Sequence, residues 1–89
     1  MAHITVEAEG DGTYRVTVAE DGSATTHLVD ASRETVAGLG AGTTPEALVE
    51  ASFRFLLDRE PKESIMASFD ITVISRYFPE YEAAIGDYL

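Results

Sequence analysis

The hydrophobic pattern of the chain changes its period near residue 30, and this change limits the possible folds more than any other feature. Before it, residues 3–9 and 13–20 alternate apolar and polar side chains, and residues 23–29 do so more weakly. Alternation with a period of two is typical of β-strands that bury one face. Short glycine-containing turns separate the three segments. Residues 1–29 are therefore predicted to form a three-stranded antiparallel β-meander.

The same alternation predicts which side chains of the meander are buried. Asp21-Gly22 is a hairpin signal between the second and third strands, because glycine tolerates positive φ angles. Leu28 is expected to be the best inward anchor of the weak third strand. The side chains that we expect on the buried face are all apolar or aromatic: Ile4, Val6, Ala8, Tyr14, Val16, Val18 and Leu28.

Beyond residue 30 the apolar residues recur at helical spacing. Asp30 or Ser32 can cap a short helix that reaches Leu39, although the sequence leaves open whether residues 30–42 form a helix or a loop. A much stronger start follows at Thr44-Pro45, where threonine caps and proline occupies the first helical position. This signal predicts one long helix over residues 44–59.

Two further prolines divide the rest of the chain into short helices. Pro61 ends the long helix and is expected to begin a second one, with Ile65, Met66 and Phe69 facing inward. Asp70 is expected to cap the next helix, and Pro79 interrupts the chain again. The predicted fold class is α+β, a three-stranded antiparallel meander followed by one long and several short helices packed on one face.

The chain is long enough for one small domain and no more. Its 89 residues predict a single domain over 1–89, with the meander in 1–29 and the helical part in 30–89. The charged corner DREPKE, residues 58–63, contains the only lysine of the chain. We interpret it as the junction of two helices, with mostly solvated charges and a surface pair between Arg54 and Asp58.

Composition argues against several function classes. The chain has sixteen acidic and six basic residues, which gives a formal charge of −10. Such a surface repels nucleic-acid phosphates and anionic lipids, so we expect neither direct nucleic-acid binding nor membrane binding. A basic protein partner is compatible with this charge, and so is simple solubility. The absence of cysteine and of a signal-peptide pattern at the start favours a cytoplasmic location.

The sequence contains no pattern that predicts catalysis. No nucleophile motif or spaced metal motif is present, and a domain of this size is expected to have little room for a large pocket. We therefore expect no enzymatic activity, cofactor or metal. A metal site that uses His3 and His27 is the alternative, if their strands lie side by side.

Protein binding is the favoured function, and two groups of residues are candidates for it. Val49, Phe53 and Leu57 form a second apolar stripe on the long helix, which is either buried between the sheet and the later helices or used as a dimer face. Tyr77 and Tyr81 lie in an aromatic-rich tail and are candidates for a partly exposed partner-binding face. The sequence thus predicts a non-enzymatic interaction or regulatory module that forms a homodimer.

Two parts of the sequence resemble known groups of proteins. The stretch FRFLLDREPKESIMASFDITVISRYFPEYEAAI, residues 53–85, resembles a group of small uncharacterised bacterial proteins that share a REPKESI corner, a phenylalanine-aspartate step and a YFPEYE ending. This resemblance implies no activity. The three strands followed by TPEALVEASFRFLL are similar to small antitoxins of the HicB type. That similarity implies an alternative function, an antitoxin-like protein that neutralises a basic toxin.

Overall fold

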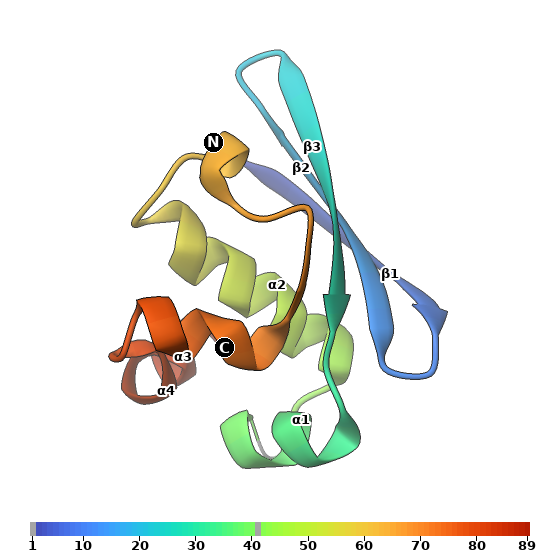
Figure 1. The fold of residues 1–89 in the computed structure, drawn as a ribbon, viewed down its shortest axis with the longest axis vertical. Coiled ribbons are helices and arrows are strands. Elements are labelled where there is room, and N and C mark those ends of the chain that lie inside the picture. The colour runs from blue at the N-terminus through green and yellow to red at the C-terminus, as the bar shows by residue number, and fades with distance from the viewer. Residues whose placement is uncertain (1, 41) are drawn as a thin grey trace.

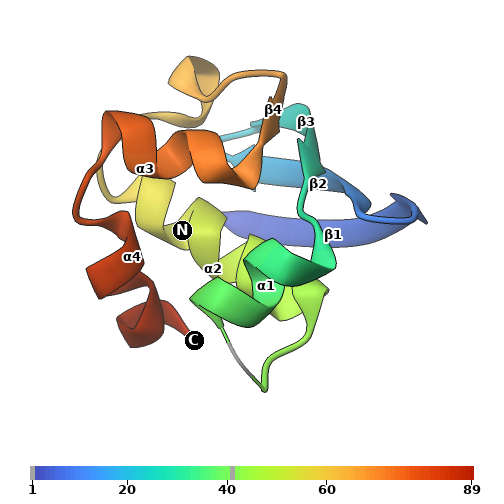
Figure 2. The same cartoon turned by 60° about the horizontal axis from the view of Figure 1, so that its bottom comes forward.

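The computed structural model describes residues 2–40 and 42–89. It is an α+β fold in which a four-stranded sheet is covered on one face by helices (Figure 1). Figure 2 shows the helical layer on one side of the strands. The elements in chain order are β1 (His3–Gly10), β2 (Thr13–Glu20), β3 (Ser23–Asp30), α1 (Arg33–Leu39), α2 (Pro45–Leu57), the 3₁₀ helix η1 (Lys62–Ser64), β4 (Ser68–Asp70), the 3₁₀ helix η2 (Ile71–Val73), α3 (Ile74–Tyr77), α4 (Tyr81–Ala84) and the 3₁₀ helix η3 (Ile85–Tyr88).

The three-stranded antiparallel meander is confirmed, but the buried face of β3 is not the predicted one. Leu28 is 43% exposed, whereas His27 and Val29 are buried. The tight turn after β2 decides this, because it pairs Glu20 with Ser23 and so places His27 beside Val16. Both turn residues have positive φ, 55° at Asp21 and 79° at Gly22, as a two-residue hairpin requires.

A fourth strand replaces the helix that was predicted after Pro61. Only η1 is helical there, and the chain then extends into β4, which pairs in parallel with β3. The N–H of Leu28 donates to the carbonyl of Ala67 at 2.8 Å, so backbone groups at the edge of β3 are paired by a segment that is distant in sequence. Parallel pairing needs a long crossover, which α1 and α2 provide. The helix prediction for Ile65, Met66 and Phe69 was therefore wrong.

The two predicted helix starts are confirmed. Ser32 caps α1, and the Thr44 hydroxyl accepts from the N–H of Ala47 at 3.1 Å at the start of α2. The helix α2 ends at Leu57, two residues before the predicted end at residue 59. No helix within residues 2–40 and 42–89 is long and apolar enough to cross a membrane.

The wide apolar surface of α2 is buried on two sides. Toward the sheet, the Phe53 ring lies 5.3 Å from the His27 ring and 6.0 Å from the Phe69 ring, measured between centroids. Toward the C-terminal helices, the Phe55 ring lies 5.2 Å from the Tyr81 ring. In the second stripe Val49 and Phe53 are fully buried and Leu57 is partly buried, as the hypothesis of burial within the fold expects, so little of this stripe is left for a dimer face.

A buried hydrogen-bond chain joins α2 to α4. The Ser52 hydroxyl donates to the carbonyl of Leu48 at 2.8 Å, and the Tyr81 hydroxyl lies 2.6 Å from Ser52 Oγ. Since the single hydroxyl proton of Ser52 is committed to Leu48, the Tyr81 hydroxyl is the donor to Ser52. Burial raises the pKa of the Tyr81 phenol. The contact fixes the C-terminal helices against the face of α2 that points away from the sheet.

The two hydrogen bonds of Ser52 predict that removing the Tyr81 hydroxyl and removing the Ser52 hydroxyl have unequal costs in stability. Tyr81→Phe loses one hydrogen bond and should lower the free energy of unfolding by about 1 kcal/mol. Ser52→Ala leaves the buried Tyr81 hydroxyl without its acceptor and should cost about 2 kcal/mol or more. Urea unfolding measures both. The double variant should lose no more than Ser52→Ala alone, and a Ser52→Ala cost below that of Tyr81→Phe would contradict the assignment.

Candidate functional site

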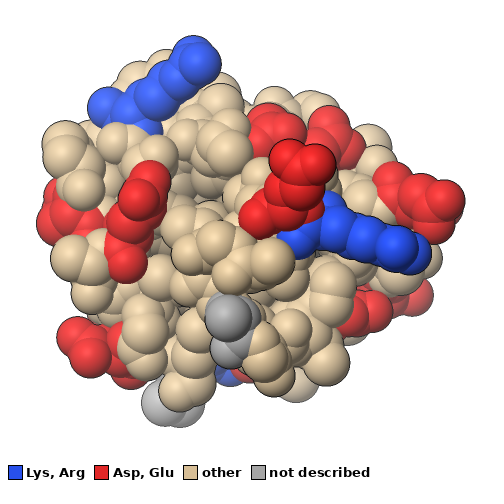
Figure 3. All heavy atoms as spheres, turned by 90° about the horizontal axis from the view of Figure 1, so that it is seen from below, with Lys and Arg blue, Asp and Glu red and all other residues tan. Residues whose placement is uncertain are grey.

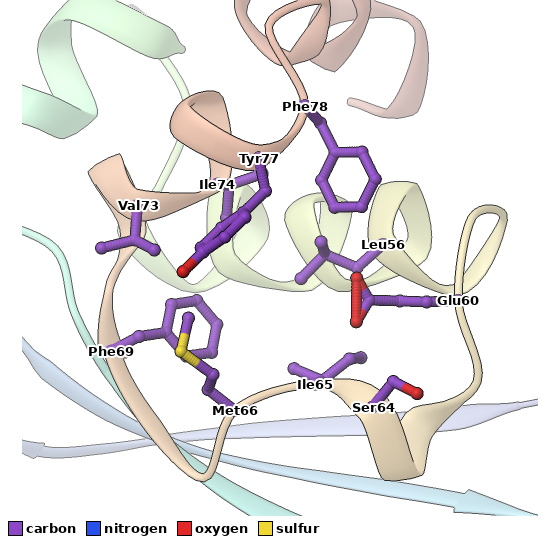
Figure 4. A pocket seen from close by; sticks show the side chains of 10 residues that line it. All are labelled: Leu56, Glu60, Ser64, Ile65, Met66, Phe69, Val73, Ile74, Tyr77 and Phe78. Atoms are coloured by element: carbon purple, nitrogen blue, oxygen red, sulfur yellow. The ribbon is translucent and has the colours of Figure 1, made fainter.

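A half-open groove lies between the segment that precedes β4 and the helix α3, and the end of α2 closes it at the back (Figure 4). Its volume is about 340 Å³, which contradicts the expectation that a domain of this size has little room for a pocket. Apart from Glu60 and Ser64, the side chains that line it are apolar or aromatic. The lining residues are Leu56, Glu60, Ser64, Ile65, Met66, Phe69, Val73, Ile74, Tyr77 and Phe78.

Two large apolar side chains at the groove are exposed to solvent. Tyr77 is 68% exposed and Met66 is 42% exposed. They come from opposite walls, Tyr77 from α3 and Met66 from the segment between η1 and β4 (Figure 4). Tyrosine and methionine are enriched in protein interfaces, and methionine adapts its shape to an occupant. The exposed rim is therefore suited to an apolar occupant.

Glu60 is the one charged residue among the ten described residues that line the groove. Figure 4 shows its carboxylate pointing into the groove from the chain that follows α2. Burial raises the pKa of the Glu60 carboxyl. None of the ion pairs among the described residues includes Glu60. The two basic neighbours in sequence bind elsewhere, Arg59 to Glu80 at 3.0 Å and Lys62 to Glu63 at 2.7 Å.

The wall that contains Met66 is tied to the sheet through His27. The Nδ1 atom of His27 lies 2.7 Å from the carbonyl oxygen of Met66, and Nε2 lies 2.8 Å from the hydroxyl of Thr25. A carbonyl only accepts, so Nδ1 carries a proton, and in the neutral ring Nε2 accepts from Thr25. His27 is 98% buried in this position, with an exposed fraction of 2%. This buried histidine has a structural role that its residue type alone did not reveal.

The other wall starts from a local cap. As predicted, Asp70 caps the turn that follows β4, since its carboxylate accepts from the N–H of Thr72 at 3.0 Å. The chain then runs through η2 into α3, which presents Tyr77. At the end of α3, Phe78 packs edge-to-face on Phe55 of α2, with ring centroids 5.9 Å apart. Both walls are thus anchored to buried side chains.

The five residues predicted for partner binding do not share one surface. Val49, Phe53 and Tyr81 are fully buried, and Leu57 is partly buried against the core. Tyr77 alone of the five lines the groove. These side chains are buried because α2 is packed on both of its sides. A wide apolar stripe is compatible with such packing but does not by itself predict it.

Sequence reasoning missed Met66 and Glu60 as groove residues. Met66 was expected to face inward from a helix, and Glu60 was treated as part of a solvated corner. The corner is also less solvated than expected, since Lys62 is only 5% exposed. Arg54 pairs with Glu50 at 3.0 Å rather than with Asp58. The one local signal was Pro61, which cannot continue α2 and so predicts that the chain changes direction beside Glu60.

The alternative of a paired His3 and His27 is wrong, and so is the simpler expectation that both are surface residues, since His27 is buried. His3 lies on β1 and His27 on β3, and β2 runs between these strands. His3 is exposed on the outer face, whereas His27 points into the core. Within the described residues, no group of three or more histidine, cysteine, aspartate or glutamate side chains is arranged to hold a metal ion.

The surface charge is spread out. Figure 3 shows one face on which acidic side chains are scattered, some at the edge and some within it, and the basic side chains lie far apart. Two of the six basic residues of the chain are already paired with acids near the groove, Arg59 and Lys62. On this face the acidic charge does not gather into one patch, and the overall charge of −10 acts as a general field around the molecule.

Comparison with known proteins identifies no relative, so the proposed function is argued from the site alone. The chain matches no family model, no curated protein and no solved structure.

The raised pKa of Glu60 predicts a pH-dependent effect on stability. Below the ordinary glutamate pKa of about 4.3 both folded and unfolded forms are protonated, so the ionisation penalty is absent; above the folded pKa it is fully present. Glu60→Gln should therefore raise the free energy of unfolding at pH 7 and have little effect at pH 3.5. Urea unfolding at both pH values measures this difference.

Glu63→Gln is the matched control, because it removes the same charge three residues away. The hydrogen bond from Lys62 lowers the pKa of Glu63. Its ionised form is thus favoured by folding, and this contribution is lost as the pH falls. Glu63→Gln should destabilise slightly at pH 7 and not at pH 3.5. Equal signs for the two variants at pH 7 would contradict the assigned environment of Glu60.

Proposed function

We propose that this protein is a non-enzymatic protein-interaction module that docks a short apolar segment of a partner in the groove. The supporting observation is the pair Met66 and Tyr77, two exposed apolar side chains that face one cavity of about 340 Å³. The cavity is near the lower end of the range for small-molecule sites. It has few of the convergent polar groups that such sites use for orientation, since Ser64 and Glu60 are its main polar side chains apart from the Tyr77 hydroxyl.

Self-association is the second part of this proposal, and it uses the open edge of the sheet. With the apolar face of α2 buried, β1 offers an eight-residue edge, HITVEAEG, without the lysine or proline that commonly protects edge strands. A two-fold antiparallel pairing centred on Thr5 places Ile4 beside Val6 and His3 beside Glu7 of the second copy. Apolar residues then meet on one face, and an imidazole meets a carboxylate on the other.

An antitoxin-like role is the alternative function. The net charge of −10 supports a basic partner, because complementary charge speeds association and disfavours acidic competitors. A small basic protein recovered with this chain from its native host, and encoded beside it, would support that role. Recovery of acidic or neutral partners only would count against it.

Partner binding should depend on the groove rim and not on exposed apolar area in general. Tyr77→Ala and Met66→Ala should each weaken binding of a co-purifying partner by about tenfold or more, as loss of an interface anchor does. Leu28→Ala is the matched control, because Leu28 is 43% exposed, like Met66, but lies outside the groove. It should change the Kd by less than about twofold. Equal losses in all three variants would overturn the groove as the docking surface.

The β1 edge predicts a charge-sensitive dimer. Thr5→Lys places two lysines opposite each other at the two-fold axis and should raise the dimer Kd by about tenfold or more. Thr26→Lys adds the same charge to an exposed position of β3, which is separated from the β1 edge by β2, and should leave the dimer intact. Sedimentation equilibrium measures both. A wild-type chain that stays monomeric at high concentration would refute this interface.

A further inference from the structure

The position of Glu60 limits what the groove can hold. Its carboxylate is the one charged group among ten lining side chains, and no ion pair in the described part of the chain neutralises it. It lies beside apolar side chains such as Leu56 and Ile65 (Figure 4). The groove thus combines an apolar surface with one unpaired anionic group.

Arg59 and Lys62, the basic residues next to Glu60 in the sequence, cannot easily move to form an ion pair with it. The guanidinium of Arg59 lies 3.6 Å from the centre of the Phe55 ring and also donates to the Phe55 carbonyl and to Glu80. The side chain of Lys62 is buried and paired with Glu63. Each would have to give up several contacts to reach Glu60. Neither of these two neighbours in sequence is therefore free to neutralise Glu60, so an occupant of the groove can supply the positive charge.

An occupant without a positive charge would be at a disadvantage. It would remove water from the Glu60 carboxylate and leave that charge without a partner, which is costly in an apolar environment. An occupant with an ammonium or guanidinium group beside its apolar part would replace the lost water by an ion pair. The net charge of −10 would also attract such an occupant over a longer range.

We propose that the groove selects a partner segment in which an apolar side chain is next to a lysine or arginine, with Glu60 as the residue that recognises the cation. The apolar side chain lies between Met66 and Tyr77, and the cation binds the Glu60 carboxylate. This inference rests on the proposed function, because it assumes that the groove is a docking site. It adds the chemical class of the occupant and the residue that determines specificity.

Two small probes separate the apolar and ionic parts of this recognition. The n-hexylammonium ion and 1-hexanol have the same chain and differ in charge. Each is titrated into the full chain while the methyl NMR signals of Met66, Ile65 and Ile74 are followed, with the Leu28 methyl signals as a reference outside the groove. Hexylammonium should bind about fivefold more tightly than hexanol. In Glu60→Gln the two probes should bind equally.

Glu82→Gln is the matched variant here, since it changes the net charge by the same amount at an exposed position outside the groove and leaves Glu60 and the Lys62–Glu63 pair in place. It should keep the preference for hexylammonium. If neither probe shifts the groove methyl signals, the docking groove itself is refuted, and the proposed function fails with it. If both probes bind the wild-type groove equally, or if the preference survives in Glu60→Gln, the groove stands and the role of Glu60 is overturned.

Discussion

Burial of α2 on both of its sides is the constraint on which the rest of the structure depends. Its Phe53 side packs on the sheet, and its Phe55 side packs on the C-terminal helices. A three-stranded meander alone can cover only one of these sides. The chain after α2 must therefore return and cover the other, and it does so with short helices because Pro61 and Pro79 interrupt any longer one.

The groove follows from how the chain makes this return. To reach the far side of α2, it first passes the edge of β3, where β4 satisfies backbone groups that would otherwise lack partners. It then turns at Asp70 into α3. The two walls are therefore held by different interactions, one by sheet pairing and His27 and the other by packing on Phe55. Side chains between them line a cavity instead of closing it.

Much of this fold could be predicted, and the failures share a cause. The meander, the cap at Thr44 and the cap at Asp70 are local features, and each was read from adjacent residues. The fourth strand could not be read in this way, because it exists only by pairing with β3. The site was predicted in part. Tyr77 was a candidate, whereas Met66 and Glu60 became groove residues only through the path of the chain around α2.

The sequence by itself determined the class of fold, the α2 boundaries to within two residues and the acidic character of the surface, because periodicity, capping and charge depend on neighbouring residues or on simple sums. The tertiary structure decided which apolar residues are exposed to solvent. It buried Val49, Phe53 and Tyr81 and left Met66 and Tyr77 exposed on one groove. Exposure is a property of distant segments that meet in space, and no local pattern contains it.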